Sequence, residues 1–334
     1  MASPEALGTT KEDARMRPST WTLGRLAGAA LTLGILIWRL GTGPFFDGVD
    51  SVRGGTLAAA SGIVVLTTVC CAWRWKTVAG GLGVHLSLPA AVAAYYRSMF
   101  LNVTVPGGIV GDVHRGVSHG RDVRDVNGAL RAVVWERSAG QVVQIVVTVI
   151  VLLAMPSPVS ASMPWLALVV ALAVLAVVLV ARALSDCDRS VWARLRNAAA
   201  RDIRNGLLAK RAWIGIALAS GLTVAGHTIT FILAARTAGT TAPLSQMLPI
   251  ALLVVMAMVL PSAAGWGPRE GVAAWVFGAA GLGAQRGVAT AVAYGVMVFV
   301  ASLPGAAVLV LAWFRRTGTP ARDEPSLRER AVHA

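Results

Sequence analysis

The sequence has few charged residues, which make up 14% of its 334 positions. A soluble domain of this length carries about 25% charged residues. Hydrophobic residues reach 56%, and the mean hydropathy is +0.66. Several apolar runs are as long as the roughly 20 residues that a helix needs to cross a bilayer. The shortage of charge therefore excludes a sizeable soluble domain and indicates an all-α polytopic membrane protein.

Patterns for covalent chemistry, metal binding and nucleotide binding are also missing. Of only three cysteines, Cys70 and Cys71 are adjacent and Cys187 stands in a basic stretch, so no disulfide framework or metal-ligand spacing is formed. The sequence contains no P-loop and no nucleophile–base arrangement. We therefore expect no enzymatic activity, no metal and no cofactor. Any transport would use a gradient or no energy source, because an ATP-binding motif is lacking.

The net charge is +14, and the basic residues concentrate in short stretches. These stretches are residues 111–137, 185–211 and 316–334. Lys and Arg in short loops mark the cytoplasmic side of a membrane protein, where the lipids are anionic. We therefore expect membrane lipid, and not nucleic acid, as the partner. The same rule places a polar N-terminus (1–20), the basic loop (185–211) and a disordered tail in the cytoplasm. We expect the chain to lie in the plasma membrane.

Six apolar runs are long enough to be full spans, and tryptophans flank most of them, as is typical at membrane interfaces. The runs are 22–42, 56–75, 130–154, 164–184, 212–235 and 288–313. Two further apolar regions, 88–110 and 247–284, are interrupted by glycine and proline. A full crossing at 88–110 would move the basic residues after it to the outside, so a re-entrant pair of short segments fits better. For 247–284, two short spans and a re-entrant hairpin both remain open.

The membrane domain, residues 21–315, therefore divides into halves at about 21–155 and 164–315. Each half has three spans and one interrupted region, and an odd number of spans inverts the second half relative to the first. Inverted halves with interrupted helices at corresponding positions are typical of transporters that bind their substrate near the middle of the membrane. The hydropathy pattern thus predicts about six full spans, two re-entrant segments and an inverted repeat.

The first interruption combines residues that break a helix with polar and charged residues. It contains Asn102, Pro106, Gly107, Gly108, Gly111, Asp112 and Arg115. Asp112 and Arg115 are three apart and share one face if a helix restarts here. The start of such a helix favours an anion, and arginine can bind a phosphate through two donors. Asp112 would either orient Arg115 or cap the helix. The simpler alternative is a helix cap beside an interfacial arginine.

Charged residues occur at two further places within apolar sequence. Glu136 and Arg137 stand at the start of a span, where Glu136 pairs either with Arg115 or Arg269 or only with water at an interface. The second interruption contains Pro261, Gly265, Gly267, Arg269, Glu270 and Gly271. Charges within the membrane are costly and usually line a cavity or pathway. Adjacent helical residues point in different directions, so Arg269 and Glu270 need not pair with each other. A plain external loop is the alternative here.

The order of these motifs resembles the transmembrane, flippase-like family of lysylphosphatidylglycerol synthases. The resemblance covers residues 20–315 and rests on the two interruptions and on Glu136–Arg137. One departure is Val110, where many members have another glycine. The family includes the membrane half of the bacterial multiple peptide resistance factor and the membrane region of some archaeal dolichyl-phosphate glycosyltransferases. We expect no soluble aminoacyl-transferase domain, so the resemblance implies lipid handling and not lysyl transfer.

The sequence therefore predicts a transporter that moves an anionic phospholipid or a polyprenyl-phosphate lipid through a polar cavity. Binding of the headgroup is expected from Asn102, Asp112, Arg115, Glu136, Arg137, Arg269 and Glu270. Two alternatives remain. One is a non-transporting membrane partner of an envelope or glycolipid glycosyltransferase. The other is a membrane-embedded enzyme that acts on lipid phosphates.

Overall fold

Every regular element of the computed structural model is a helix in the residues that it describes, which are 20–105, 108–155, 189–209, 212–260 and 266–317. The α-helices are α1 (Thr20–Leu40), α2 (Gly43–Asp50), α3 (Gly54–Gly81), α4 (Leu88–Thr104), α5 (Val110–Asp122), α6 (Val126–Ala154), α8 (Arg189–Asp202), α9 (Ala212–Thr237), α10 (Leu244–Ala257), α11 (Pro268–Ala279) and α12 (Ala284–Thr317), with a π-helical turn, η2 (Ile203–Leu207), after α8. Four of these, α3, α6, α9 and α12, are long and apolar enough to cross a membrane. The prediction of an all-α polytopic membrane protein is confirmed.

The predicted spans correspond to individual helices where the structure describes them. The runs predicted from 56, 130, 212 and 288 appear as α3, α6, α9 and α12, and the first run appears as α1. The run 164–184 lies outside the described residues. Helix α3 is longer than predicted, because it continues past Trp73 and Trp75 to Gly81. Its tryptophans therefore do not end the span.

The described helices α3–α6 of the first half and α9–α12 of the second follow the same order and make corresponding contacts. In the first half, the short helices α4 and α5 lie between α3 and α6 along the chain. In the second half, α10 and α11 lie between α9 and α12. Helix α5 packs on α6 as α11 packs on α12, and α4 packs on α12 as α10 packs on α6. Helices α3 and α9 pack against each other at the centre. This correspondence is the one that a repeat predicts.

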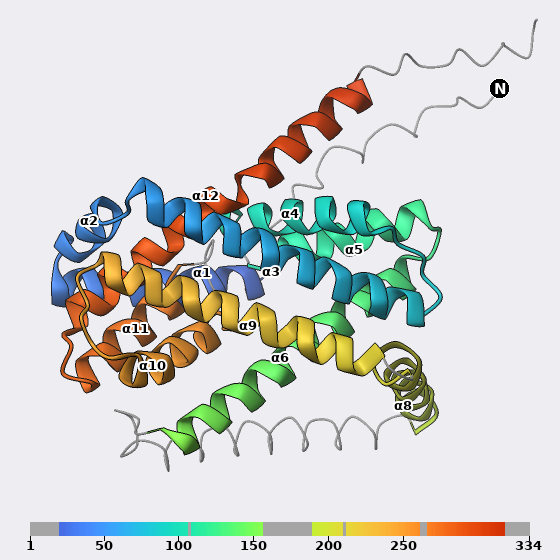
Figure 1. Ribbon diagram of the computed structural model, residues 1–334. Coiled ribbons are helices and arrows are strands. Elements are labelled where there is room, and N and C mark those ends of the chain that lie inside the picture. The colour runs from blue at the N-terminus through green and yellow to red at the C-terminus, as the bar shows by residue number, and fades with distance from the viewer. Residues whose placement is uncertain (1–19, 106–107, 156–188, 210–211, 261–265, 318–334) are drawn as a thin grey trace, which may run out of the picture.

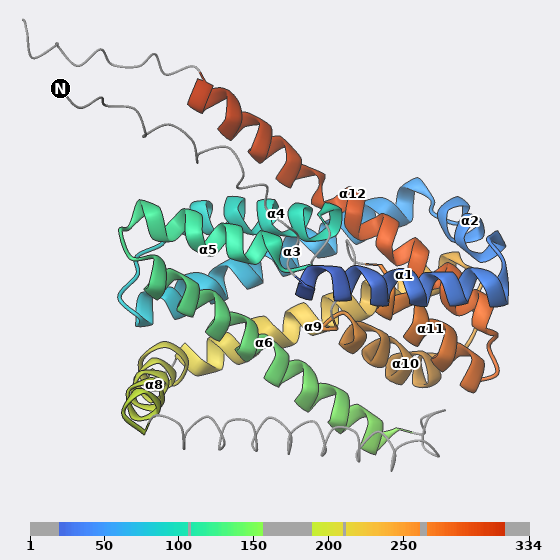
Figure 2. The same cartoon turned by 180° about the vertical axis from the view of Figure 1, so that it is seen from behind.

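The directions of the helices show that the repeat is inverted (Figure 1). Helices α3 and α9 run in opposite directions, and so do α6 and α12. The α4–α5 pair enters from the end of the molecule near α8, whereas the α10–α11 pair enters from the opposite end. Both pairs turn back near the middle. Helices α1 and α2 add to the second half, where α1 contacts α11 and α2 contacts α12 (Figure 2).

Small residues allow the helices to approach closely, as is usual in membrane bundles. A Cβ atom added to Gly305 of α12 would lie 2.7 Å from the carbonyl carbon of Tyr96 in α4. One added to Gly287 of α12 would lie 2.7 Å from the carbonyl carbon of Ala273 in α11. Large apolar side chains such as Phe231, Phe277 and Met297 fill the core of the second half. The short helices are therefore held by the long ones.

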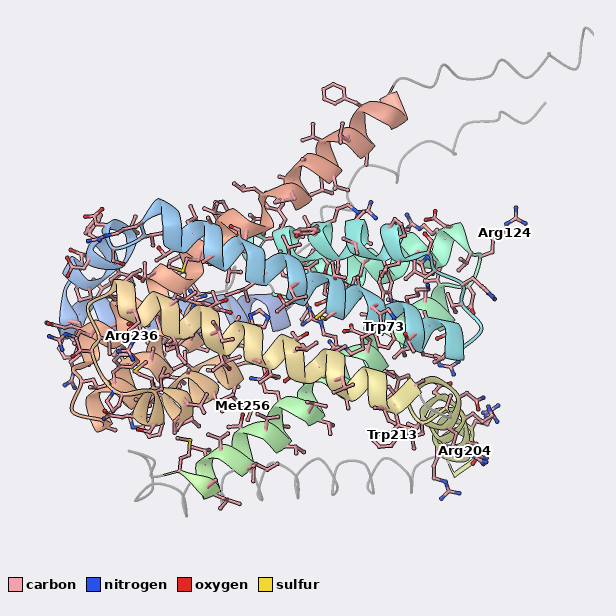
Figure 3. The ribbon with its side chains drawn as sticks, viewed as in Figure 1. Trp73, Arg124, Arg204, Trp213, Arg236 and Met256 are labelled. Atoms are coloured by element: carbon pink, nitrogen blue, oxygen red, sulfur yellow. The ribbon has the colours of Figure 1, made fainter. Side chains whose placement is uncertain are left out.

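Helix α8, whose sequence contains four arginines, lies at one end of the molecule (Figure 1 and Figure 3). Arg204, in the π-helical turn after α8, lies there with Arg124 of the α5–α6 connection, whereas Arg236 lies at the other end. The predicted basic loop thus contains helix α8 and the π-helical turn. The positive-inside rule makes this end the cytoplasmic one. That orientation stays a prediction.

Candidate functional site

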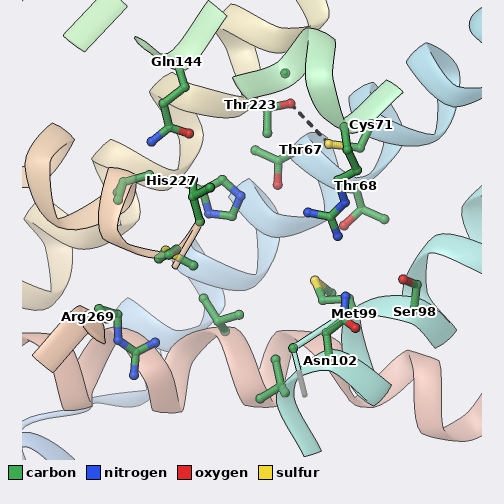
Figure 4. Close-up of a pocket in the computed structure, with 18 of the residues that line it drawn as sticks. Thr67, Thr68, Cys71, Ser98, Met99, Asn102, Gln144, Thr223, His227 and Arg269 are labelled. Atoms are coloured by element: carbon green, nitrogen blue, oxygen red, sulfur yellow. Dashed lines mark hydrogen bonds between the residues drawn. The ribbon is translucent and has the colours of Figure 1, made fainter. Parts of the chain in front are cut away.

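A cavity of about 620 Å³ lies where the two short-helix pairs turn back. Residues from α3, α4, α6, α9, α10, α11 and α12 line it, so both halves contribute. Figure 4 shows Arg269 on one side of this space and Thr67, Thr68 and Cys71 on the other. Its volume is in the range of ligand-binding pockets, about 300–1,000 Å³. A cavity whose largely apolar wall carries arginines, glutamines and hydroxyl groups is the candidate site.

Glu136 of α6 is the centre of a buried ion-pair network beside the cavity. It is fully buried and accepts hydrogen bonds from two arginines and a tyrosine. Arg74 of α3 donates from Nε to Oε1 at 2.9 Å and also from Nη2. The hydroxyl of Tyr95 donates to Oε1 at 2.9 Å, and Arg115 donates from Nη2 to Oε2 at 2.7 Å. Glu136 thereby joins α3, α4, α5 and α6.

Asp112 of α5 extends this network toward the cavity. Its Oδ1 accepts from Arg115 Nε at 3.1 Å and from Ser98 Oγ at 3.2 Å. Its Oδ2 accepts from Arg137 Nη2 at 2.5 Å and from Asn102 Nδ2 at 3.1 Å. The Asn102 side-chain oxygen in turn accepts from the backbone N–H of Gly111 at 2.8 Å. Asn102 therefore ties the end of α4 to the start of α5.

We call Arg74, Arg115, Arg137, Asp112 and Glu136 the arginine cluster. Three arginines against two carboxylates leave one positive charge without compensation inside the cluster. Arg137 lines the cavity and its side chain is 44% exposed, whereas that of Arg115 is fully buried. The excess positive charge is therefore presented to the cavity by Arg137.

Arg115 is held by aromatic rings as well as by carboxylates. Its guanidinium carbon lies 4.6 Å from the ring centre of Trp75 and 4.2 Å from that of Tyr95. Such cation–π contacts strengthen when water is removed. Arg115 is thus a positioning residue of the cluster, and it lies behind the cavity wall.

Arg269 and Glu270 form the second charged site, at the start of α11. Arg269 donates to Glu270 Oε1 from Nε at 2.9 Å and from Nη2 at 2.5 Å. Glu270 is fully buried, and its Oε2 accepts from the backbone N–H of Gly267 at 2.8 Å. Gly267 has φ +110°, a backbone conformation that favours glycine. The turn before α11 therefore holds the carboxylate, and the carboxylate holds the arginine.

Glycines on the long helices make room for an arginine at each charged site. A Cβ atom added to Gly140 of α6 would lie 3.0 Å from Nη1 and Nη2 of Arg74. One added to Gly295 of α12 would lie 2.5 Å from Nη2 of Arg269. Both glycines line the cavity. The two halves therefore use a similar device, in which an arginine from one helix crosses a glycine on another.

The structure separates the predicted site residues into two groups. Asn102, Arg137 and Arg269 line the cavity. Asp112, Arg115, Glu136 and Glu270 are buried behind its wall as partners of the arginines. The two groups are nevertheless in direct contact, because each carboxylate bonds to an arginine of the lining.

The pairings settle three alternatives that the sequence left open. Glu136 pairs with Arg115, and not with Arg269. Asp112 orients Arg115, and α5 begins after Ile109 without a side-chain cap. Arg269 and Glu270 do pair with each other, although they are adjacent. They can do so because the long arginine side chain turns back toward a carboxylate that the Gly267 N–H already holds.

The interruptions are shorter than predicted. Gly108, with φ +63°, and Gly267 stand in the gaps between the short helices. Gly111 and Gly271 lie inside α5 and α11, where each provides room for a neighbour: the backbone of Ser98 in α4 and the side chain of Thr32 in α1. The other predicted break residues lie outside the described residues; they are Pro106, Gly107, Pro261 and Gly265.

Several cavity residues were not predicted from the sequence. Arg74 stands between two tryptophans that suggested an interface, yet it is buried. Gln141 and Gln144 line the cavity from α6, and their recurrence on one face of an apolar span was an available signal. His227 of α9 also lines the cavity, and its Nδ1 lies 2.8 Å from the Tyr294 hydroxyl. In the described parts of the chain, no group of three His, Cys, Asp or Glu side chains is placed to hold a metal ion.

We expect Gly111→Ala to destabilise the protein by about 1–3 kcal/mol, the usual effect of overpacking. The added Cβ atom would lie 2.6 Å from the carbonyl carbon of Ser98, which is backbone and cannot move aside alone. The matched control is Gly62→Ala in α3, where nothing lies within 4 Å of the added atom. The measurement is the midpoint of thermal unfolding in detergent, and equal midpoints for the two variants would contradict the close approach of α4 and α5.

Comparison with known protein families confirms the resemblance seen in the sequence. The transmembrane region of lysylphosphatidylglycerol synthase matches residues 23–305, which is more than half of the chain. No curated protein and no solved structure matches it. The matched region of the family is its membrane part and not its catalytic domain. The chain therefore belongs to the family of the lysylphosphatidylglycerol synthase transmembrane region.

Proposed function

We propose that this protein binds the headgroup of an anionic lipid in the cavity and moves it across the plasma membrane. The observation that carries the proposal is the placement of arginines from both halves around one cavity. Arg74 and Arg137 come from the first half, and Arg269 comes from the second. A lipid phosphate bound between them would contact both parts of the inverted repeat.

The energetics favour an anion at this place. Cations inside a membrane are costly, and they persist where a partner compensates them. The carboxylates of the arginine cluster leave one positive charge uncompensated, and this charge is exposed at Arg137. A phosphate would supply the missing negative charge. Arginine is well suited to it, because its planar guanidinium can donate two parallel hydrogen bonds to phosphate oxygens.

The proposal gives the predicted site residues two different roles. Arg137 and Arg269 contact the phosphate, and Asn102 lies beside them in the wall. Asp112, Glu136 and Glu270 position the arginines, as does Arg115 from behind the wall. The sequence position of Arg115 suggested that this residue binds the phosphate directly. In the proposal, Arg137 has that role instead.

The inverted repeat supplies a path to both sides of the membrane. The α4–α5 pair comes from one end, the α10–α11 pair comes from the other, and the cavity lies at their tips (Figure 1). In transporters of this architecture, one half rocks against the other around a fixed site. We place the end that contains α8 in the cytoplasm, together with both termini.

The test is lipid movement in reconstituted vesicles. Wild-type protein should move an acyl-labelled anionic phospholipid between leaflets faster than protein-free vesicles, as measured by chemical quenching of the outer label. Arg137→Met should slow this movement by about tenfold, since a charge-assisted hydrogen bond contributes about 1.5–3 kcal/mol. Arg121→Met, which removes an exposed arginine outside the cavity, is the matched control. A wild-type rate equal to that of protein-free vesicles would refute the proposal.

A further inference from the structure

A polar stripe runs along the cavity side of α6. Its members are Arg137, Gln141, Gln144 and Thr148, which are spaced by four, three and four residues. This spacing places all four on one face of an α-helix. Arg137, Gln141 and Gln144 line the cavity, and Thr148 is buried at the end of the stripe. The stripe therefore begins at the cationic residue and continues with neutral polar groups.

The neutral part of the stripe contains three polar atoms that have no hydrogen bond to the described residues. They are the buried atoms Gln141 Oε1, Gln144 Nε2 and Thr148 Oγ1. Gln144 is only 9% exposed and Thr148 only 1%. Leaving a buried polar group unpaired is unfavourable, and in a membrane bundle such groups are rare without a function. Three of them in a row beside a cavity point to a ligand that supplies hydroxyl donors and acceptors.

The carboxylates near the cavity are not available to a cationic ligand. Both oxygens of Glu136 accept from protein donors, and so do both oxygens of Asp112. Glu270 uses one oxygen for Arg269 and the other for Gly267. Among the described residues that line the cavity, the charged side chains are arginines. An amine on a headgroup would therefore meet positive charge and find no free carboxylate.

From these observations we infer the substrate class: an anionic phospholipid whose headgroup carries uncharged hydroxyl groups, as glycerol or a cyclic polyol does. The inference rests on the proposed function and deepens it. The phosphodiester lies at Arg137, and the hydroxyls of the headgroup bond to Gln141 and Gln144. Arg137 and Gln141 are four residues apart, or about 6 Å along the helix axis, which suits a phosphate and the hydroxyls next to it. Headgroups that end in an amine are disfavoured.

The experiment compares lipids that share acyl chains and label but differ in headgroup. Wild-type protein in vesicles should move phosphatidylglycerol and phosphatidylinositol at least tenfold faster than phosphatidylethanolamine, and faster than phosphatidic acid. The double variant Gln141→Met/Gln144→Met keeps the side-chain size and removes the amides. It should slow the two hydroxylated lipids by about tenfold, to the rate of phosphatidic acid, and leave phosphatidic acid unchanged. Gln246→Met is the matched control, because Gln246 donates to the Ala280 carbonyl away from the cavity.

A second variant tests the same site by adding a charge. Gln144→Glu places a carboxylate in the lining, so it should raise the rate for phosphatidylethanolamine relative to phosphatidylglycerol by at least fivefold. A loss of fold would slow all lipids alike and would not change this ratio. Retention of each lipid by detergent-purified protein, measured by native mass spectrometry, provides a readout that needs no transport.

The outcomes separate the two proposals. Equal wild-type rates for hydroxylated and amine headgroups, or equal loss of all lipids in the double variant, would overturn the substrate class while transport stands. No movement of any lipid, with selective retention of phosphatidylglycerol that Gln144→Glu weakens, would overturn transport and support the headgroup preference. Neither movement nor selective retention would overturn both.

Discussion

Arg269→Met should slow the movement of anionic lipid by about 10- to 100-fold. A charge-assisted hydrogen bond contributes about 1.5–3 kcal/mol, and each 1.4 kcal/mol changes a rate about tenfold. Arg269 is the arginine that the second half brings to the cavity. Its guanidinium carbon also lies 5.4 Å from the ring centre of Tyr294, so its position is fixed from two sides. The measurement is the initial rate in vesicles, with Arg286→Met, an exposed arginine of α12, as the control.

Removing Arg269 also leaves Glu270 buried without its partner, which lowers stability. Two companion variants separate this effect from the loss of binding. Arg269→Met/Glu270→Gln removes both charges, so the fold should recover while transport stays slow. Gly295→Val keeps both charges but places atoms where the Arg269 Nη2 lies, since even a Cβ atom would be 2.5 Å from it. It should slow transport although the arginine is present.

The result that contradicts this assignment is specific. If the double variant transports at the wild-type rate, Arg269 serves only to neutralise Glu270. If Gly295→Val transports normally, the position of the guanidinium does not matter. Either result would leave Arg137 alone as the phosphate contact and would remove the reason for a site shared by both halves.

The sequence predicted the architecture because hydropathy and loop charge act over whole segments. The interrupted regions around Gly108 and Gly267 were recognisable from glycine and proline alone, and they do connect short helices. The inverted order followed from the count of spans. Tryptophan was a less dependable guide: Trp73 and Trp75 suggested the end of a span, but Trp75 is fully buried in the core of the first half.

The charged partners were harder to predict because they depend on tertiary packing. Arg74 and Glu136 are 62 residues apart, and nothing local links them. Arg115 was recognised, but its burial behind Trp75 and Tyr95 places it outside the cavity wall. The role of Gly111 depends on how closely α5 approaches Ser98. Local sequence therefore identified which residues are unusual, whereas packing decides which of them face a ligand.

Glu136→Gln should be the most destabilising single change in the first half. Glu136 is fully buried and receives hydrogen bonds from Arg74, Tyr95 and Arg115. Removing its charge leaves three arginines against Asp112 alone, an excess of two positive charges in place of one. Removing one partner of a buried ion pair typically lowers stability by about 3–5 kcal/mol, and we expect a loss of that size here. The measurement is the thermal midpoint in detergent, with Asp47→Asn on the exposed face of α2 as the control.

A compensating variant shows whether the loss comes from charge or from packing. Glu136→Gln/Arg115→Gln returns the cluster to an excess of one positive charge and keeps a polar side chain in both places. It should recover at least half of the stability that Glu136→Gln loses, because the uncompensated arginine is gone. Failure to recover would mean that the cluster depends on hydrogen-bond geometry and not on charge balance. The proposed anion binding also depends on charge balance. Glu136 limits the excess positive charge of the cluster, and Arg137 presents that charge to the cavity.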